Sequence, residues 1–407
     1  MKRQGRLFEQ IIDPANIRHA WLRCLRGKRR KAEVIRFSRD LDDRLREIHR
    51  RLSALEPQWG DYESFVVREP KTRIISAVAL DQRIMHHAIM NVLEPIFDRH
   101  LVYHTYACRK GKGTHAAVRY ALRCTRRHAW FVKLDVRRYF DTIDHLVLKS
   151  QLRRLIKDGR VLYLLDGVID SYRTVPGKGL PIGNLTSQFF ANHYLSSHDH
   201  TMMEREKAEA YLRYMDDMVM YAGSVIDSRR LAEASRQFCA ATLQLELKEP
   251  VIQRCSGGVA FLGFLVRPQG IYLTAESKRR FRRRAVQIGR ELHSGAIDEA
   301  QASQRANGVN AALLLARSRR FRATVWHGAD LGHEPDSPGR QLEQQRLQLH
   351  GCQPEQQQPA QPEQQQRVPR RVPLSPAATQ ADSSKAEPVR PAVGQRSGGN
   401  RAALSFR

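Results

Sequence analysis

Two acidic residues, Asp216 and Asp217, stand side by side in the stretch YLRYMDDMVMYAG, which otherwise has the composition of β-strands. Asp is depleted from strands, and adjacent carboxylates repel each other unless a cation lies between them. We therefore expect a hairpin with strands over 211–214 and 218–222 and with Met215 and both acids in its turn. Because Mg²⁺ is typically held by one or two carboxylates plus substrate phosphates, the pair indicates phosphoryl chemistry. A plain solvated hairpin is the alternative interpretation.

A third acid, Asp135, closes the β-rich run AWFVKLDV. Phosphoryl transfer of this kind uses two ions about 3.5–4 Å apart, one at the attacking oxygen and one at the leaving oxygen. Such a centre needs a carboxylate from a second strand end, and Asp135 is the best candidate. The expected chemistry is nucleotidyl transfer with two Mg²⁺ ions.

The overall charge points to a polyanionic partner. Lys and Arg number 69 against 42 Asp and Glu, which gives a net charge of +27 in 407 residues. Nucleic acid is favoured over an acidic membrane because no amphipathic anchor helix accompanies the charge. A merely solvated basic surface is the alternative.

The cysteines and the apolar runs indicate the compartment in which the protein is expected. The six cysteines include no CxxC pair, so we expect reduced thiols in a cytoplasmic protein, with neither a disulfide framework nor a zinc site. No apolar run reaches about 18 residues, so we expect no membrane span and no signal peptide.

The elements that must position the acids follow from periodicity. NIRHAWLRCLRG, LDDRLREIHRRLSAL and QRIMHHAIMNVLEPIF repeat apolar residues at helical spacing, whereas SFVVREPKTRIISAV alternates like two strands around a Pro-Lys turn. Helices are also expected at DHLVLKSQLRRLI, LYLLDGVIDSYRTV and DSRRLAEASRQFCAATLQ, and one opens within PGKGLPIGNLTSQFFANHYL. VAFLGFLVRPQGIYL predicts a pair of short strands around Gly263 and Gly270, and a very basic helical region follows.

Six blocks stand in the order in which they occur in reverse transcriptases, and the chain resembles that family from about residue 61 to residue 275. The blocks are EPKTRII (69–75) and ACRKGKGTHAA (107–117) for the fingers, KLDVRRYFDTID (133–144) for the first catalytic block, GLPIGNLTSQFFAN (179–192) for the template grip, LELKEP (245–250) for the lysine block and FLGF (261–264) for the primer grip.

The resemblance implies an α+β right-hand polymerase with α/β fingers, a palm of antiparallel strands backed by helices, and a helical thumb, plus a disordered C-terminal tail. The expected domains are a basic helical N-terminal extension (1–60), fingers (61–134), a palm with the catalytic motifs (135–275), a basic helical thumb (276–330) and a Gln/Pro/Arg-rich tail (331–407).

The same resemblance implies roles for the acids and for one lysine. Asp135 and Asp216 would bind both ions with help from the carbonyl of Val136, and Asp217 would lie nearby. Lys248 would donate a proton to the leaving pyrophosphate, a general-acid task. An ordinary surface lysine is the alternative for that residue.

Further residues are implied to contact the substrate. Phe140 would lie beneath the sugar and exclude a 2′-hydroxyl, so that deoxynucleotides are selected. Lys71 and Arg73 would contact the triphosphate, since cations stabilise transferring phosphoryl groups. Gly183 lacks a Cβ and would let the backbone approach the nascent base pair. The alternatives are a core aromatic, a solvated strand edge and a simple turn before a helix.

Two departures from the usual pattern indicate a subtype. Most reverse transcriptases have Gln where this chain has Ile182 and Pro where it has Gln188, and IGNLTSQ resembles the enzymes of diversity-generating retroelements. That family copies a template RNA into cDNA with frequent errors opposite adenine, and the cDNA replaces a variable region of a target gene. We hypothesise that Ile182, which cannot hydrogen-bond the incoming nucleotide, loosens discrimination. The implied partners are template RNA, RNA–DNA hybrid, deoxynucleotides and a small basic accessory protein.

The tail offers an independent indication. If its Gln codons are CAA, a shift of one nucleotide converts EQQQP and EQQQR into AAC runs that encode Asn, as in template repeats of this family. Residues 341–371 would then be a by-product of overlapping coding, and a Gln/Pro-rich linker is the alternative. The alternative functions for the protein are those of a group II intron-type or retron reverse transcriptase, of a catalytically silent RNA-binding scaffold, and of a general basic RNA-binding protein.

Overall fold

The N-terminal part of the chain is helical, as its periodicity predicts. The computed structural model describes residues 3–68 and 72–329, which belong to one compact unit, Met1–His350. In α2, Ile17 and Trp21 lie one turn apart and are buried against α5, so that the basic residues face outward. The helices before the first strand are α1 (Phe8–Ile12), α2 (Pro14–Cys24), α3 (Ala32–Arg39) and α4 (Leu41–Ser53).

A two-stranded hairpin follows these helices. β1 (Glu63–Val67) and β2 (Arg73–Ala77) are antiparallel, with Phe65 opposite Ile75, and every residue of β1 is exposed. This confirms the two strands expected from SFVVREPKTRIISAV. α5 (Leu80–His100) comes next and is buried along most of its length.

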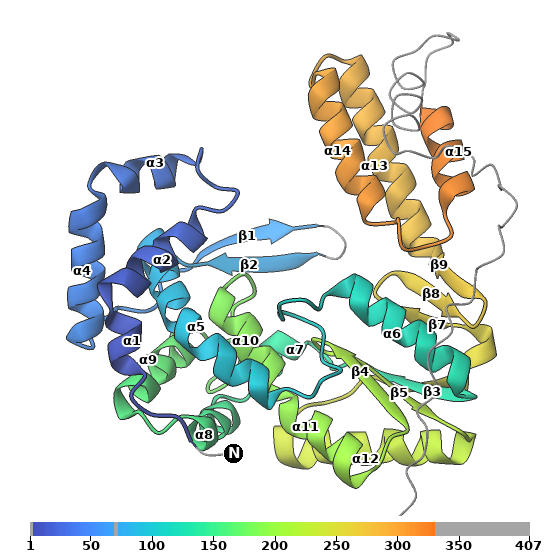
Figure 1. Cartoon of the computed structure of the whole chain (residues 1–407), viewed down its shortest axis with the longest axis horizontal. Coiled ribbons are helices and arrows are strands. Elements are labelled where there is room, and N and C mark those ends of the chain that lie inside the picture. The colour runs from blue at the N-terminus through green and yellow to red at the C-terminus, as the bar shows by residue number, and fades with distance from the viewer. Residues whose placement is uncertain (1–2, 69–71, 330–407) are drawn as a thin grey trace, which may run out of the picture. The chain divides into compact units, whose positions relative to one another are not determined.

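The central sheet has four antiparallel strands in the order β4-β5-β3-β6, and Figure 1 labels the first three. Its strands are β3 (Trp130–Leu134), β4 (Ala210–Tyr214), β5 (Asp217–Ala222) and β6 (Val251–Arg254). Tyr214 pairs with Asp217, so the hairpin turn contains only Met215 and Asp216. Asp217, which we expected in the turn, is therefore the first residue of β5, because the turn is one residue shorter than expected.

Alternation along the strands divides the interior into two cores. Val132 and Leu134 of β3 face a core with α8, α10 and α12, whereas Phe131 faces a second core with α6 and the small sheet described below. Helices therefore cover both faces of the sheet. The helices between α5 and β6 are α6 (Thr114–Arg127), α7 (Tyr139–Thr142), α8 (His145–Leu155), α9 (Gly159–Asp170), α10 (Leu185–Tyr194), α11 (Ser196–His200), which continues as a π-helical turn (Thr201–Arg205), and α12 (Val225–Leu243).

The segment after the central sheet contains three strands rather than the two expected. A 3₁₀ turn (Cys255–Gly257) leads into β7 (Val259–Phe261), β8 (Phe264–Arg267) and β9 (Gly270–Leu273), which form an antiparallel sheet. Gly263 and Gly270 both have positive φ, so each supports a tight turn and the run is folded twice.

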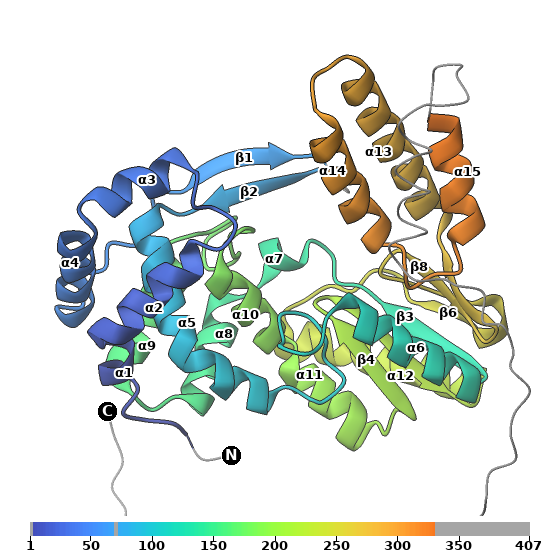
Figure 2. The ribbon, with the colours of Figure 1, turned by 45° about the horizontal axis from the view of Figure 1, so that its top comes forward.

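Three helices then pack together, α13 (Ala275–His293), α14 (Glu299–Ala311) and α15 (Arg319–Ala329), as Figure 2 shows. Across residues 3–68 and 72–329, no helix has the length and hydropathy needed to cross a membrane. The expected tail, 331–407, lies outside the described residues.

Candidate active site

Two of the three predicted acids meet at the end of the central sheet. Asp135 directly follows β3, whose last residue, Leu134, pairs with Met218 of β5, so it lies beside the β4–β5 turn. The carboxyl groups of Asp135 and Asp216 lie close enough for the Asp135 charge to disfavour ionisation of Asp216. Burial, and next the Asp135 carboxylate, raise the pKa of Asp216, because both disfavour its charged form.

The residue before Asp216 has an unusual backbone geometry. Met215 has φ of 58°, in the left-handed region that residues with a side chain rarely adopt. Such a conformation persists only where the surroundings stabilise it, and it commonly marks a functional site.

Two lysines balance the acids. Lys248 Nζ lies 2.7 Å from Asp135 Oδ2, and its backbone N–H also donates to the Asp135 carbonyl. Lys133 Nζ lies 3.2 Å from Asp217 Oδ1. Sequence reasoning selected Lys248 and missed Lys133, although Lys133 stands two residues before Asp135 and so must lie on the same face of the strand.

Burial also changes the pKa of Asp217. Burial raises its pKa to about 6, and Lys133 opposes that shift. At neutral pH the carboxyl group is therefore ionised, but at a desolvation cost that a nearby cation would reduce.

The donors present fit a hard divalent cation that is completed by substrate. Within residues 3–68 and 72–329, no three His, Cys, Asp or Glu side chains form a ready metal cage. Asp135 and Asp216 nevertheless provide two mutually repelling carboxylates, and Mg²⁺ commonly takes only one or two carboxylates beside phosphate oxygens. The backbone bridge at Val136 uses Asp135 O and Arg137 N, so the Val136 carbonyl is not one of its acceptors.

The loop expected to contact the nascent base pair lies against the β1–β2 hairpin. The Ser76 N–H donates to the Ile182 carbonyl at 2.8 Å. Gly183 has φ of 121°, and a Cβ there would lie 2.6 Å from Ile75 Cγ2. The close approach that requires glycine in this structure is thus to β2.

The remaining predicted substrate residues surround this region. Phe140 is half-buried on α7 and packs edge-to-face on Tyr139. Arg73 is exposed on β2, and Lys71 lies outside the described residues. Gln188 is exposed on α10, where its Oε1 accepts from Cys108 Sγ at 3.4 Å.

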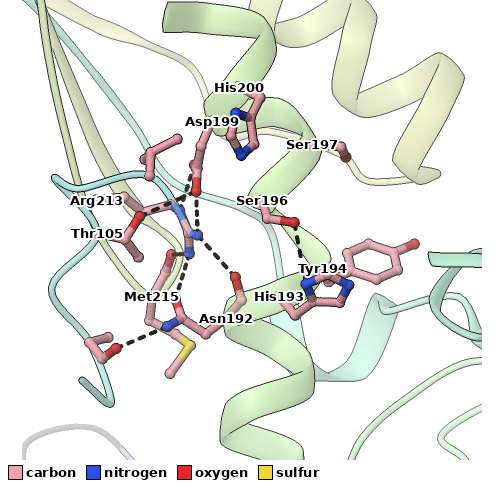
Figure 3. A network of polar contacts seen from close by, with 12 residues as sticks. Thr105, Asn192, His193, Tyr194, Ser196, Ser197, Asp199, His200, Arg213 and Met215 are labelled. Carbon is pink, nitrogen blue, oxygen red and sulfur yellow. Dashed lines mark hydrogen bonds and ion pairs between the residues drawn. The ribbon is translucent and has the colours of Figure 1, made fainter. Parts of the chain in front are cut away.

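A buried ion pair behind the turn was not predicted. Arg213 and Asp199 are fully buried and lie 2.5 Å apart through Nη2 and Oδ2 (Figure 3). The sequence offers only a weak signal, a charged residue at an inward-facing position of a strand otherwise made of Ala, Tyr and Leu.

Comparisons with known proteins show which sequences this chain resembles. Residues 67–266 match the family described as "Reverse transcriptase (RNA-dependent DNA polymerase)". Protein YkfC of Escherichia coli is 27% identical over 251 residues, which are 50% of this chain and 65% of YkfC. "Nuclear intron maturase 1, mitochondrial" of Arabidopsis thaliana is 26% identical over 127 residues, 27% of this chain and 18% of the maturase.

The chain thus spans just under two thirds of YkfC and much less of the maturase. Among solved structures, an apo telomerase from Candida tropicalis superposes with a TM-score of 0.40 at 12% identity, covering 52% of this chain and 55% of the telomerase chain. Residues 67–266 of this chain, which include all three acids, are a reverse transcriptase domain.

Proposed function

We propose that this chain is an RNA-directed DNA polymerase that uses Mg²⁺. The observation that carries the proposal is the strand pairing that places Asp135, directly after β3, beside Asp216 in the β4–β5 turn. In the reaction, the primer 3′-oxygen bonds to the α-phosphorus of a deoxynucleotide, the bond to the β-phosphate oxygen breaks and pyrophosphate leaves.

The chain's own residues divide this work. Bound Mg²⁺ ions would activate the primer oxygen and neutralise the leaving phosphates, held by Asp135 and Asp216 with the Val136 carbonyl and with Asp217 nearby. Lys248, which lies 2.7 Å from Asp135, would protonate the leaving pyrophosphate. Phe140 would exclude a 2′-hydroxyl.

We also propose a right-hand arrangement. The fingers are residues 61–134 with the β1–β2 hairpin, the palm is 135–275 with the central sheet, the thumb is the helical region 276–330, and the N-terminal extension is 1–60. Lys71 and Arg73 would meet the triphosphate, and template RNA and RNA–DNA hybrid would be held through their phosphates, contacts that position without reading sequence.

Primer extension by the full chain tests the activity. On an RNA template with a DNA primer, Mg²⁺ and all four deoxynucleotides, we expect full-length cDNA. Hybrid binding without extension would instead favour the silent RNA-binding scaffold.

We further propose the diversity-generating subtype, which copies a template-repeat RNA with errors opposite adenine for mutagenic retrohoming and works with a small basic accessory protein. Ile182 and Gln188 in IGNLTSQ support it. Replacing Ile182 with Gln should lower misincorporation opposite adenine, measured by sequencing cDNA copied from a defined RNA, and unchanged errors would refute the role of Ile182.

A group II intron-type enzyme is the second candidate, favoured by relatives that are named intron maturases. This candidate carries no expectation of excess errors opposite adenine. The error spectrum of the wild-type chain therefore separates the two candidates.

A further inference from the structure

The guanidinium of Arg213 has a partner for each of its N–H donors. Arg213 lies on β4, three residues before Asp216, and its side chain is fully buried. Its hydrogen bonds run from Nε to Asp199 Oδ1 (2.7 Å), from Nη1 to Asn192 Oδ1 (2.9 Å) and the Met215 carbonyl (2.9 Å), and from Nη2 to the Asn192 carbonyl (2.9 Å) and Asp199 Oδ2 (2.5 Å), as in Figure 3. These five bonds use all five donors of the side chain.

The anion of the pair is supported as fully. Asp199 lies on α11, and its carboxylate also accepts from the Tyr211 hydroxyl at 2.5 Å and from Thr105 Oγ1 at 3.4 Å. Removing two charges from water is costly unless their remaining hydrogen bonds are satisfied, and here they are. Both side chains are therefore held rigidly in the core and can position a neighbouring group.

The neighbouring group is the catalytic turn. The Met215 carbonyl that Arg213 binds belongs to the peptide group whose nitrogen is that of Asp216. Met215 is also the residue with left-handed φ, a geometry that needs support from its surroundings. Fixing that peptide plane fixes the direction in which the Asp216 side chain leaves the turn.

The same residue also aligns two other segments. Arg213 N donates to the His104 carbonyl and the Tyr106 N–H donates to the Arg213 carbonyl, so the segment before α6 runs beside β4. Asn192, which receives two of the guanidinium bonds, lies on α10 and donates to the Ala107 carbonyl.

We infer that Arg213, paired with Asp199, is a positioning residue that holds the Met215 peptide so that Asp216 meets Asp135 at the cation site. The inference rests on the proposed polymerase function. Lysine cannot replace arginine here, since an ammonium has three donors without the planar fork that reaches Asp199, Asn192 and Met215 together.

The test compares the full-length wild type with Arg213→Lys. Each is bound to an RNA–DNA hybrid with a dideoxy-terminated primer and the next deoxynucleotide, and Mn²⁺ binding is measured by electron paramagnetic resonance, so that no turnover is needed. We expect Mn²⁺ affinity to fall by roughly tenfold and the extension kcat on a normal primer by roughly tenfold to a hundredfold. Hybrid affinity should stay the same.

Tyr211→Phe is the matched control, because it removes one hydrogen bond from the same buried carboxylate and leaves the bond to Met215 in place. It should lower Tm and keep wild-type Mn²⁺ affinity. Wild-type Mn²⁺ affinity in folded Arg213→Lys would overturn the inference.

Asn192→Ala decides the matter if Arg213→Lys does not fold. It keeps the ion pair but removes the side-chain acceptor that shares Nη1 with Met215, and it should shift Mn²⁺ affinity in the same direction by a smaller factor. No shift in folded Asn192→Ala would then overturn the inference. Failure of the wild-type complex to bind Mn²⁺ or extend a primer would refute the proposed function instead, so the two failures are distinguishable.

Discussion

Three carboxylates and two lysines share the end of the central sheet. Asp135 is paired with Lys248 and Asp217 with Lys133, while Asp216 lies near Asp135 and has no lysine in its described ion pairs. When all three acids are ionised, one negative charge is left at the turn. A divalent cation beside Asp135 and Asp216 would compensate it and would relieve the repulsion between the two acids.

This environment predicts a pH-dependent cation requirement. The pKa of Asp216 is raised, and that of Asp217 is raised to about 6, so protons compete with the cation as the pH falls. The Mg²⁺ concentration for half-maximal primer extension should rise as the pH falls below about 6. A half-saturation value constant from pH 7.5 to 5.5 would contradict this explanation.

The raised pKa of Asp217 also makes the free energy of unfolding depend on pH. Because the pKa of Asp217 is higher in the folded than in the unfolded state, its contribution is present at low pH and is lost as the pH rises through about 6. Without metal, the wild type should lose up to about 3 kcal/mol relative to Asp217→Asn between pH 4 and pH 7. Chemical denaturation of both proteins across this range measures it, and parallel curves would refute it.

Lys248 offers a separate test of proton donation. Lys248→Gln should lower kcat by roughly a hundredfold with little change in the KM for deoxynucleotide. Lys178→Gln is the control, since Lys178 is also near an aspartate, Asp144, but outside the site. Equal losses in the two variants would show a general charge effect.

At the scale of elements, the contact between the β1–β2 hairpin and the loop before α10 can be tested at Gly183. Alanine there meets Ile75 Cγ2 at 2.6 Å and also has unfavourable φ. Gly183→Ala should lower kcat/KM for deoxynucleotide by roughly tenfold, because the hairpin must move, and adding Ile75→Ala should restore part of it.

Gly177→Ala separates the two effects. Gly177 also has positive φ, but a Cβ there has nothing within 4 Å. This variant should lose some stability and keep its kcat/KM. A Gly177→Ala loss of kcat/KM equal to that of Gly183→Ala would mean that contact with the hairpin is unimportant.

The elements that sequence predicts well are those with several repeats of a period. The long helices and the first hairpin follow from spacings of 3.6 and 2 residues. β6 and the third strand of the small sheet have only four residues each, too few for alternation to be distinctive. The predicted start of the second hairpin strand was wrong by one residue, at Asp217, because turn length depends on strand pairing.

Some residues of the candidate site could be predicted from the sequence and others could not. Asp135, Asp216 and Lys248 could be selected from motif order, and the structure brings them together. Arg213 and Asp199 could not, because their roles depend on burial and on contacts between residues 14 positions apart. Sequence spacing alone does not show which charged residue is buried.

At the scale of the whole molecule, the net charge of +27 predicts salt-sensitive binding of hybrid. The logarithm of the association constant should fall linearly with the logarithm of salt concentration. Arg279, exposed on α13, is expected to contact a phosphate, and Arg279→Gln should make the slope shallower by about 1. Arg229→Gln, which changes an exposed arginine of α12, should leave the slope unchanged. Equal slopes in all three proteins would contradict a phosphate contact at Arg279.

The most direct test of the central claim is single-nucleotide addition to a primer on an RNA template by the full chain and by its Asp135→Asn and Asp216→Asn variants, at equal hybrid occupancy and in Mg²⁺. The shared cation site predicts that the wild type extends the primer, and that each variant binds the hybrid equally well but adds nucleotide at least ~1,000-fold more slowly. Addition by either variant at a rate close to that of the wild type would contradict it.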